Sequence, residues 1–305
     1  MRTLLQANCI GALAARSLLV GGSGVVGFVV SAFPNSFYVR TIKNDLVFIT
    51  NRQLKSPITV NLDSAAVIER IVAPLEPVSV DKRNIHMGNT ATIQLSATIP
   101  DGDGYNLENP SAQQFRLTKE ALNLSSTILT IIDTSNSVLD SKGLAHEGTR
   151  NFVRTGIITL RDSGRAEHFS EAAMKIVGLG SGFTPSGDDV LGGFLSTYNS
   201  LAHSISRSKV LLDLDLVQKN TTWISAKLLD YMQCQVLDDQ VQQLIRSVAL
   251  GSEDEFILAT ETLLPRGHTS GIDISVGAIL ALCLISDIKG NGSNTESIAR
   301  NMGLS

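Results

Sequence analysis

The chain has 305 residues, enough for one large domain or two modest ones. Apolar residues make up 43%, charged residues 18%, and the formal net charge is −4, so the composition is globular and lacks the basic surface that nucleic-acid binding requires. The three cysteines lack CxxC spacing, which argues against a disulfide framework or a zinc site. Without a clean signal-peptide core or an uninterrupted apolar stretch of membrane-spanning length, we expect a soluble, cytoplasmic protein.

The first third of the chain predicts a β-rich domain. Runs of Val, Ile, Phe, Tyr and Thr alternate with turn residues, at a spacing typical of hairpins. The predicted strands are Val25–Ala32, Phe37–Ile42, Leu46–Thr50, Ile58–Leu62 and Thr90–Ile99. A turn-rich connector follows, so we predict that residues 1–110 form an antiparallel β-rich domain.

The rest of the chain, residues 111–305, predicts a mainly helical domain, which makes the fold class α+β. Apolar residues recur there at helical spacing, and short loops between the later segments favour antiparallel neighbours in a bundle. The predicted helices are Leu117–Ile132, Ser163–Val177, Ser186–Ser204, Thr222–Gln233, Asp238–Ala249, Ser252–Leu264 and Gly271–Ile288.

The stretch Gly178–Asp189 (GLGSGFTPSGDD) is the most informative motif in the chain. Its three alternating glycines allow positive φ angles and a close approach to a ligand. Ser186 fits the N-cap of the following helix, and Asp189 stands at the capping-box distance behind it. A Gly-rich turn that leads into a helix leaves N–H groups and a positive dipole end for an anion such as phosphate or carboxylate.

A second copy of this pattern occurs at Arg266–Gly277 (RGHTSGIDISVG). When Ser270 is aligned with Ser186, both copies read S-G-x-D-x-x-x-G without a gap. The other matched pairs are Asp189 with Asp273 and Gly193 with Gly277. We therefore predict that two helix starts converge on one anionic ligand, although either copy alone is explained as an ordinary helix cap.

This interpretation selects a set of candidate residues. The candidates for substrate binding are Gly180, Ser181, Gly182, Thr184, Ser186, Gly187, Asp189, Arg266, Thr269, Ser270, Gly271 and Asp273. The candidates for catalysis are Asp188 and His268. Consecutive helical residues diverge by about 100°, so we expect Asp189 to serve as the cap partner and Asp188 to be the free carboxylate, facing a ligand or a Mg²⁺ ion.

The two motifs do not fit the common nucleotide-binding patterns. No Walker lysine follows the glycines, and their spacing is not that of a dinucleotide fingerprint. His86 lies in a polar segment that we interpret as a turn between strands, where a structural or solvated role is favoured.

The segments GLGSGFTPSGDDVLGG and GHTSGIDISVG resemble the AllH-like family, whose namesake is a subunit linked to oxamate carbamoyltransferase in anaerobic allantoin use. The first motif carries G-x-G-x-T-P-S-G-D-D intact, with Ser181 where the family usually has Pro. The resemblance covers roughly the C-terminal half. It implies small anionic substrates, namely carbamoyl phosphate, oxamate or oxalurate, and other carbamoyltransferase subunits as partners.

Within this resemblance, some of the candidates have an expected role. Arg266 would pair with a carboxylate or phosphate, and His268 would act as acid or base. The backbone N–H groups of Gly180–Gly182 would stabilise charge on a carbamoyl oxygen.

Three functions remain open at this stage. The first is a carbamoyltransferase subunit that acts with partner chains. The second is a Mg²⁺-dependent hydrolase that uses Asp188 or Asp189, and the third is a non-catalytic anion-binding assembly subunit. None involves nucleic acid or a membrane, and each is compatible with a homo-oligomer.

Overall fold

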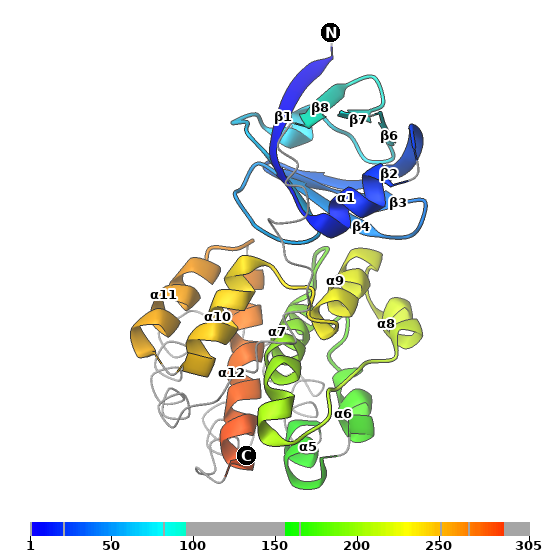
Figure 1. Cartoon of the computed structure of the whole chain (residues 1–305). Helices are drawn as coiled ribbons and strands as arrows, with labels where there is room; N and C mark the ends of the chain where they lie inside the picture. Colours follow the sequence, from blue (N-terminus) through cyan, green and yellow to red (C-terminus); the bar gives the residue numbers. More distant parts are fainter. Residues whose placement is uncertain are drawn as a thin grey trace. The chain divides into compact units, whose positions relative to one another are not determined.

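The computed structural model describes residues 2–95, except 21 and 82, and residues 156–289, except 165, 251 and 268. The chain divides into two compact units, Met1–Pro110 and Ser111–Ser305. Each unit is described separately below (Figure 1). The predicted helix Leu117–Ile132 lies outside the described residues.

The first unit is a closed eight-stranded barrel (Figure 1, blue to cyan). Its elements are β1 (Thr3–Ile10), α1 (Ala12–Leu19), β2 (Gly24–Phe33), β3 (Ser36–Thr41), β4 (Leu46–Thr50), β5 (Thr59–Leu62), the 3₁₀ helix η1 (Ile68–Arg70), β6 (Pro77–Val80), β7 (Asn84–Met87) and β8 (Ala91–Leu95). Around the barrel the strands follow the order β1-β5-β4-β3-β2-β6-β7-β8. The predicted β-rich N-terminal part is thus confirmed.

Two strand pairs in this barrel are parallel. β1 pairs with β8 to close the barrel, and β4 pairs with β5, whereas the other six pairs are antiparallel. The prediction of an antiparallel domain therefore needs correction at these two places. Burial alternates along β3 and β8, which points Val39 and Ile93 inward, where they are fully buried. In β4 and β5, Ile49 and Val60 are also fully buried, but their strands are buried along most of their length.

The described part of the second unit is helical, as predicted. Its helices are α5 (Ile158–Ser163), α6 (Ala166–Ala173), α7 (Ser186–Leu201), the 3₁₀ helix η4 (Ala202–Ile205), α8 (Leu214–Asn220), α9 (Trp223–Gln233), α10 (Asp239–Leu250), α11 (Glu253–Leu263) and α12 (Ser270–Ile288). The predicted helix Ser163–Val177 is shorter in the structure: α5 ends at Ser163, Gly164 follows in a left-handed conformation, and α6 covers Ala166–Ala173.

The centre of this unit is the pair α7 and α12, which lie side by side (Figure 1, green and orange-red). Helix α12 is apolar around most of its circumference, as expected for a helix surrounded by protein. It is the one helix of the described residues that is long and apolar enough to cross a membrane, but 83% of its apolar window is buried within the structure. The same length and burial are found in the core helix of a soluble protein.

Candidate functional site

The two copies of S-G-x-D-x-x-x-G meet, as predicted, and they meet reciprocally. The Thr184 hydroxyl lies 3.2 Å from the Ser270 hydroxyl. Hydroxyls of Ser270 and Thr184 hydrogen-bond the Asp189 carboxyl group, and hydroxyls of Ser186 and Thr269 hydrogen-bond that of Asp273. Each copy therefore supplies a serine to the aspartate of the other, and α7 and α12 begin at the same end of the helix pair.

The last glycine of each copy allows this close contact. A Cβ on Gly193 would lie 2.0 Å from the carbonyl oxygen of Ile274, and one on Gly277 would lie 1.9 Å from that of Val190. Ile274 and Val190 each follow the aspartate of their own copy. The two contacts are thus equivalent, which gives the helix pair an approximate two-fold relation.

The first glycine of each copy is also a packing residue. A Cβ on Gly187 would lie 2.0 Å from the carbonyl oxygen of Ile176, and one on Gly271 would lie 1.9 Å from that of Leu263. Both glycines are buried. A side chain at either position would collide with the backbone of the preceding segment. Close packing, rather than access for a substrate, therefore explains why glycine follows serine in each copy.

The predicted capping boxes do not form. Pro185, not Ser186, precedes α7, and neither α7 nor α12 has a side-chain cap. Hydrogen bonds within the chain also occupy backbone N–H groups at these helix starts. Gly187 N–H donates to the carbonyl of Leu179 at 2.8 Å, and Gly271 N–H donates to that of Arg266 at 3.0 Å. An anion at this place would therefore contact side chains and the loop more than the helix amides.

The expectation that Asp188 is the free carboxylate and Asp189 the cap partner is wrong in its contacts. Asp188, buried with 2% exposure, accepts hydrogen bonds from Gly178 N–H at 2.8 Å, from the Ser225 hydroxyl at 2.6 Å and from the Thr221 hydroxyl. It is the partnered carboxylate, and it ties the glycine loop to the start of α9. Burial raises its pKa above the ordinary value, while Ser225 and Thr221 oppose this shift.

Asp189 instead carries the free oxygen. Its Oδ2 atom is buried without a hydrogen-bond partner, and the same holds for Oδ2 of Asp273. Burial raises the pKa of Asp189 to about 7, helped by the negative charge of Asp273 and opposed by Ser270 and Arg266. Burial likewise raises the pKa of Asp273 to about 6, opposed by the hydroxyls of Ser186 and Thr269.

The glycine loop before α7 is exposed and held at both ends. Residues Gly180–Phe183 are exposed, and Gly180 and Gly182 have φ angles of 114° and 99°, as the alternating glycines predict. At one end, Gly178 N–H donates a hydrogen bond to Asp188. At the other end, the Thr222 hydroxyl donates one to the carbonyl of Phe183 at 2.5 Å. The loop, including Ser181, is thus presented to solvent beside Thr184.

Arg266 lies near the helix starts but already has a partner. It forms an ion pair with Asp238, whose Oδ1 also accepts Val241 N–H at 3.0 Å near the start of α10. Its positive charge nevertheless acts on Asp189. His268 lies outside the described residues. Among the residues that are described, no group of three or more His, Cys, Asp and Glu side chains is placed to hold a metal ion.

The sequence reasoning missed the residues that hold the loop, namely Thr221, Thr222 and Ser225. Thr222 caps α9 by accepting Ser225 N–H at 3.1 Å, a Thr-x-x-Ser pattern that is readable as a helix start. Its contact with the glycine loop is not readable, since the partners are about 40 residues apart.

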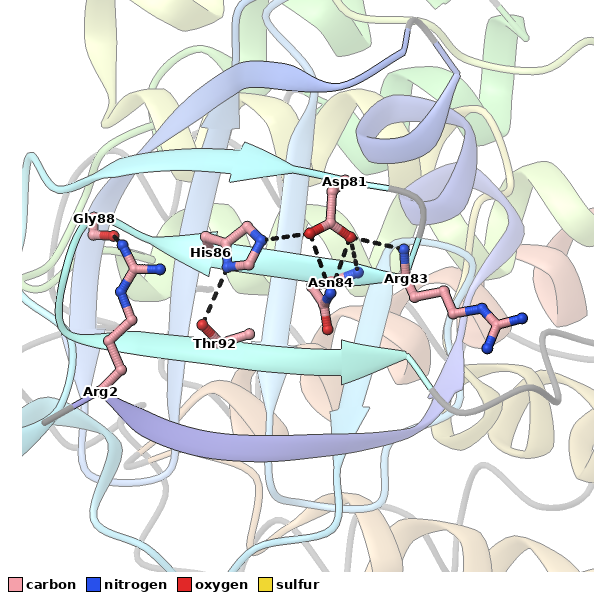
Figure 2. Close-up of polar contacts among 7 residues, drawn as sticks. All are labelled: Arg2, Asp81, Arg83, Asn84, His86, Gly88 and Thr92. Carbon is pink, nitrogen blue, oxygen red and sulfur yellow. Dashed lines mark hydrogen bonds and ion pairs between the residues drawn. The ribbon is translucent and has the colours of Figure 1, made fainter.

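The barrel has its own polar network, on β7 and its neighbours (Figure 2). His86 lies in a strand rather than in a turn. Its Nε2 atom lies 2.8 Å from Asp81 Oδ2, and its Nδ1 atom lies 3.1 Å from the Thr92 hydroxyl. The network links β7, β8 and the turn after β6, which agrees with a structural role for this histidine.

The match to a known protein family lies in the helical unit. Residues 176–282, about a third of the chain, match the family model of the oxamate carbamoyltransferase subunit AllH. No curated protein and no solved structure gave a match. The matched range contains both copies of the motif, so the resemblance to the AllH-like family is confirmed over residues 176–282, the family of a carbamoyltransferase subunit that acts with other subunits.

Proposed function

We propose that this chain is a carbamoyltransferase subunit that binds a small anionic substrate, carbamoyl phosphate or oxamate, at the joined starts of α7 and α12. The observation that carries the proposal is the reciprocal contact of the two motifs, within the range that matches the family model. Duplicated helix starts that meet at one place bring polar groups from distant segments together, as substrate sites require.

The binding groups are the side chains and the loop at the rim of this contact. Thr184, Ser186, Thr269 and Ser270 are partly exposed hydroxyl residues, and Arg266 is the nearby cation. The exposed loop Gly180–Phe183 offers backbone N–H groups to a carbamoyl or phosphate oxygen. Carbamoyl transfer then requires partner subunits, which the family description implies.

The test is anion binding followed by activity. Calorimetric titration of the chain, alone and with its partner subunits, would use carbamoyl phosphate, oxamate and inorganic phosphate as separate probes. We expect R266A and T184V each to weaken binding at least about tenfold, a loss of about 1.4 kcal/mol. R246A, an exposed arginine on α10, is the matched control and should bind like the wild type. Unchanged binding and transfer in both site variants would refute the proposed site.

A further inference from the structure

Two buried carboxyl oxygens at this site have no hydrogen-bond partner among the residues that the structure describes. Asp189 is 7% exposed and Asp273 is 1% exposed, and Oδ2 of each has no hydrogen bond. Leaving a buried polar atom without a hydrogen bond is unfavourable, because its contact with water is not replaced. The two unpaired atoms occupy equivalent positions of a duplicated motif. We therefore look for one partner that satisfies both.

The surroundings restrict what that partner is. Among the described residues, the charged groups that act on Asp189 are Asp273 and Arg266, and the hydroxyls of Ser186 and Thr269 hydrogen-bond Asp273. Arg266 is shared with Asp238, so it cannot neutralise both aspartates. Both unpaired Oδ2 atoms are almost inaccessible to solvent, so little room remains for a bound ion or molecule. A proton is the smallest species that can satisfy both atoms.

We propose that Asp189 and Asp273 form an acid–base pair that shares one proton at neutral pH and exchanges it with the substrates of carbamoyl transfer. This rests on the proposed function. The hydroxyls of Thr184, Ser186, Thr269 and Ser270 contact these carboxyl groups and are themselves partly exposed, so they provide the proton path to the surface. Burial that raises both carboxyl pKa values to about 7 and about 6 supports the arrangement.

The proton count of the reaction matches a pair of this kind. In transfer from carbamoyl phosphate to oxamate, a bond forms between the carbamoyl carbon and the amide nitrogen, and the carbon–oxygen bond to phosphate breaks. The ionised member of the pair takes the proton lost by that nitrogen. The protonated member supplies a proton to the leaving phosphate, and the pair returns to its one-proton state.

The first test is the pH profile of carbamoyl transfer by the assembled complex between pH 5 and 9. We expect a wild-type maximum between about 6 and 7, and D189N and D273N should each lower kcat about 100-fold or more with little change in KM. R246A should keep the wild-type profile. A wild-type kcat and pH profile in either Asp-to-Asn variant would overturn the proposal.

The second test does not depend on activity. Because burial raises the folded pKa values of Asp189, Asp273 and their neighbour Asp188 above 3.8, the folded chain should lose stability as the pH rises from about 4 to about 7. The part of this loss that disappears in D189N and in D273N belongs to the pair. The wild-type melting temperature should fall by about 5 °C or more over this range, and D189N should flatten the fall. A flat wild-type profile, or a stabilisation by Mg²⁺ that needs both aspartates, would overturn the shared proton. If D189N and D273N each flatten the fall but the complex transfers no carbamoyl group, the proposed function fails and the acid–base pair stands.

Discussion

The Cα atom of Gly277 lies so close to the backbone of Val190 that an added Cβ would be 1.9 Å from its carbonyl oxygen. This contact and its equivalent at Gly193 set the distance between α7 and α12. The aspartates, serines and threonines of the candidate site are placed by that distance, because all of them lie within the first turn of the two helices or just before it.

We predict that G277A and G193A each destabilise the helical unit by about 3 kcal/mol, because the added methyl group meets backbone atoms that cannot move independently. Urea unfolding followed by circular dichroism measures the loss. G182A is the control: its Cβ meets nothing within 4 Å, so only the cost of a positive φ angle, about 1 kcal/mol, should appear. Equal losses in all three variants would refute the packing role.

The sequence predicted correctly which two segments meet. It did not predict the hydrogen bonds that each residue of these segments makes. The alignment of Ser186 with Ser270 needs only residue order, and the contact between the copies follows it. Which of Asp188 and Asp189 is fully hydrogen-bonded depends on donors at Thr221 and Ser225, more than 30 residues away in the chain. Two identical neighbouring side chains carry no local signal for such partners.

The barrel shows the same limit. Long apolar runs such as β2 and β4 are recognisable from composition, whereas the four-residue strands β6 and β7 contain Ser79, Asn84 and His86 and look like turns. Their place is set by neighbouring strands in the closed sheet. The parallel pairing of β1 with β8 joins residues 88 positions apart, such as Thr3 and Ala91, and no local pattern predicts it.

Asp188 should be more important for stability than for chemistry. We predict that D188A destabilises the chain by about 3 kcal/mol, because it leaves one buried donor, Ser225, and two half-buried donors without their acceptor. S225A removes one donor and should cost about 1 kcal/mol. Denaturant unfolding tests both values, and limited proteolysis of loop 178–183 should show faster cleavage in D188A. A loop that stays resistant in D188A would contradict the anchoring role.

The Asp81 network gives the barrel a predictable response to acid. The backbone N–H of Arg83, then His86 and Asn84, hold the pKa of Asp81 well below its ordinary value of 3.8. A lowered folded pKa adds stability that is present above about pH 4 and is lost as the pH falls below it. D81N should therefore be less stable than the wild type at pH 7, and the difference should shrink at pH 3. A difference that is the same at both pH values would contradict this origin.

Asp238 competes with any anion for Arg266, and this competition is testable. Asp238 is 7% exposed and its Oδ2 holds the guanidinium group, while its Oδ1 accepts Val241 N–H at 3.0 Å. D238N keeps an oxygen for that amide but removes the negative charge. We predict that it tightens binding of inorganic phosphate or carbamoyl phosphate about 2- to 5-fold, the size expected for release of a partly exposed ion pair. The gain should vanish in the double variant D238N/R266A, because the freed arginine is its cause. A D238N chain that binds these anions more weakly than the wild type would show that Asp238 orients Arg266 for the anion rather than competing with it.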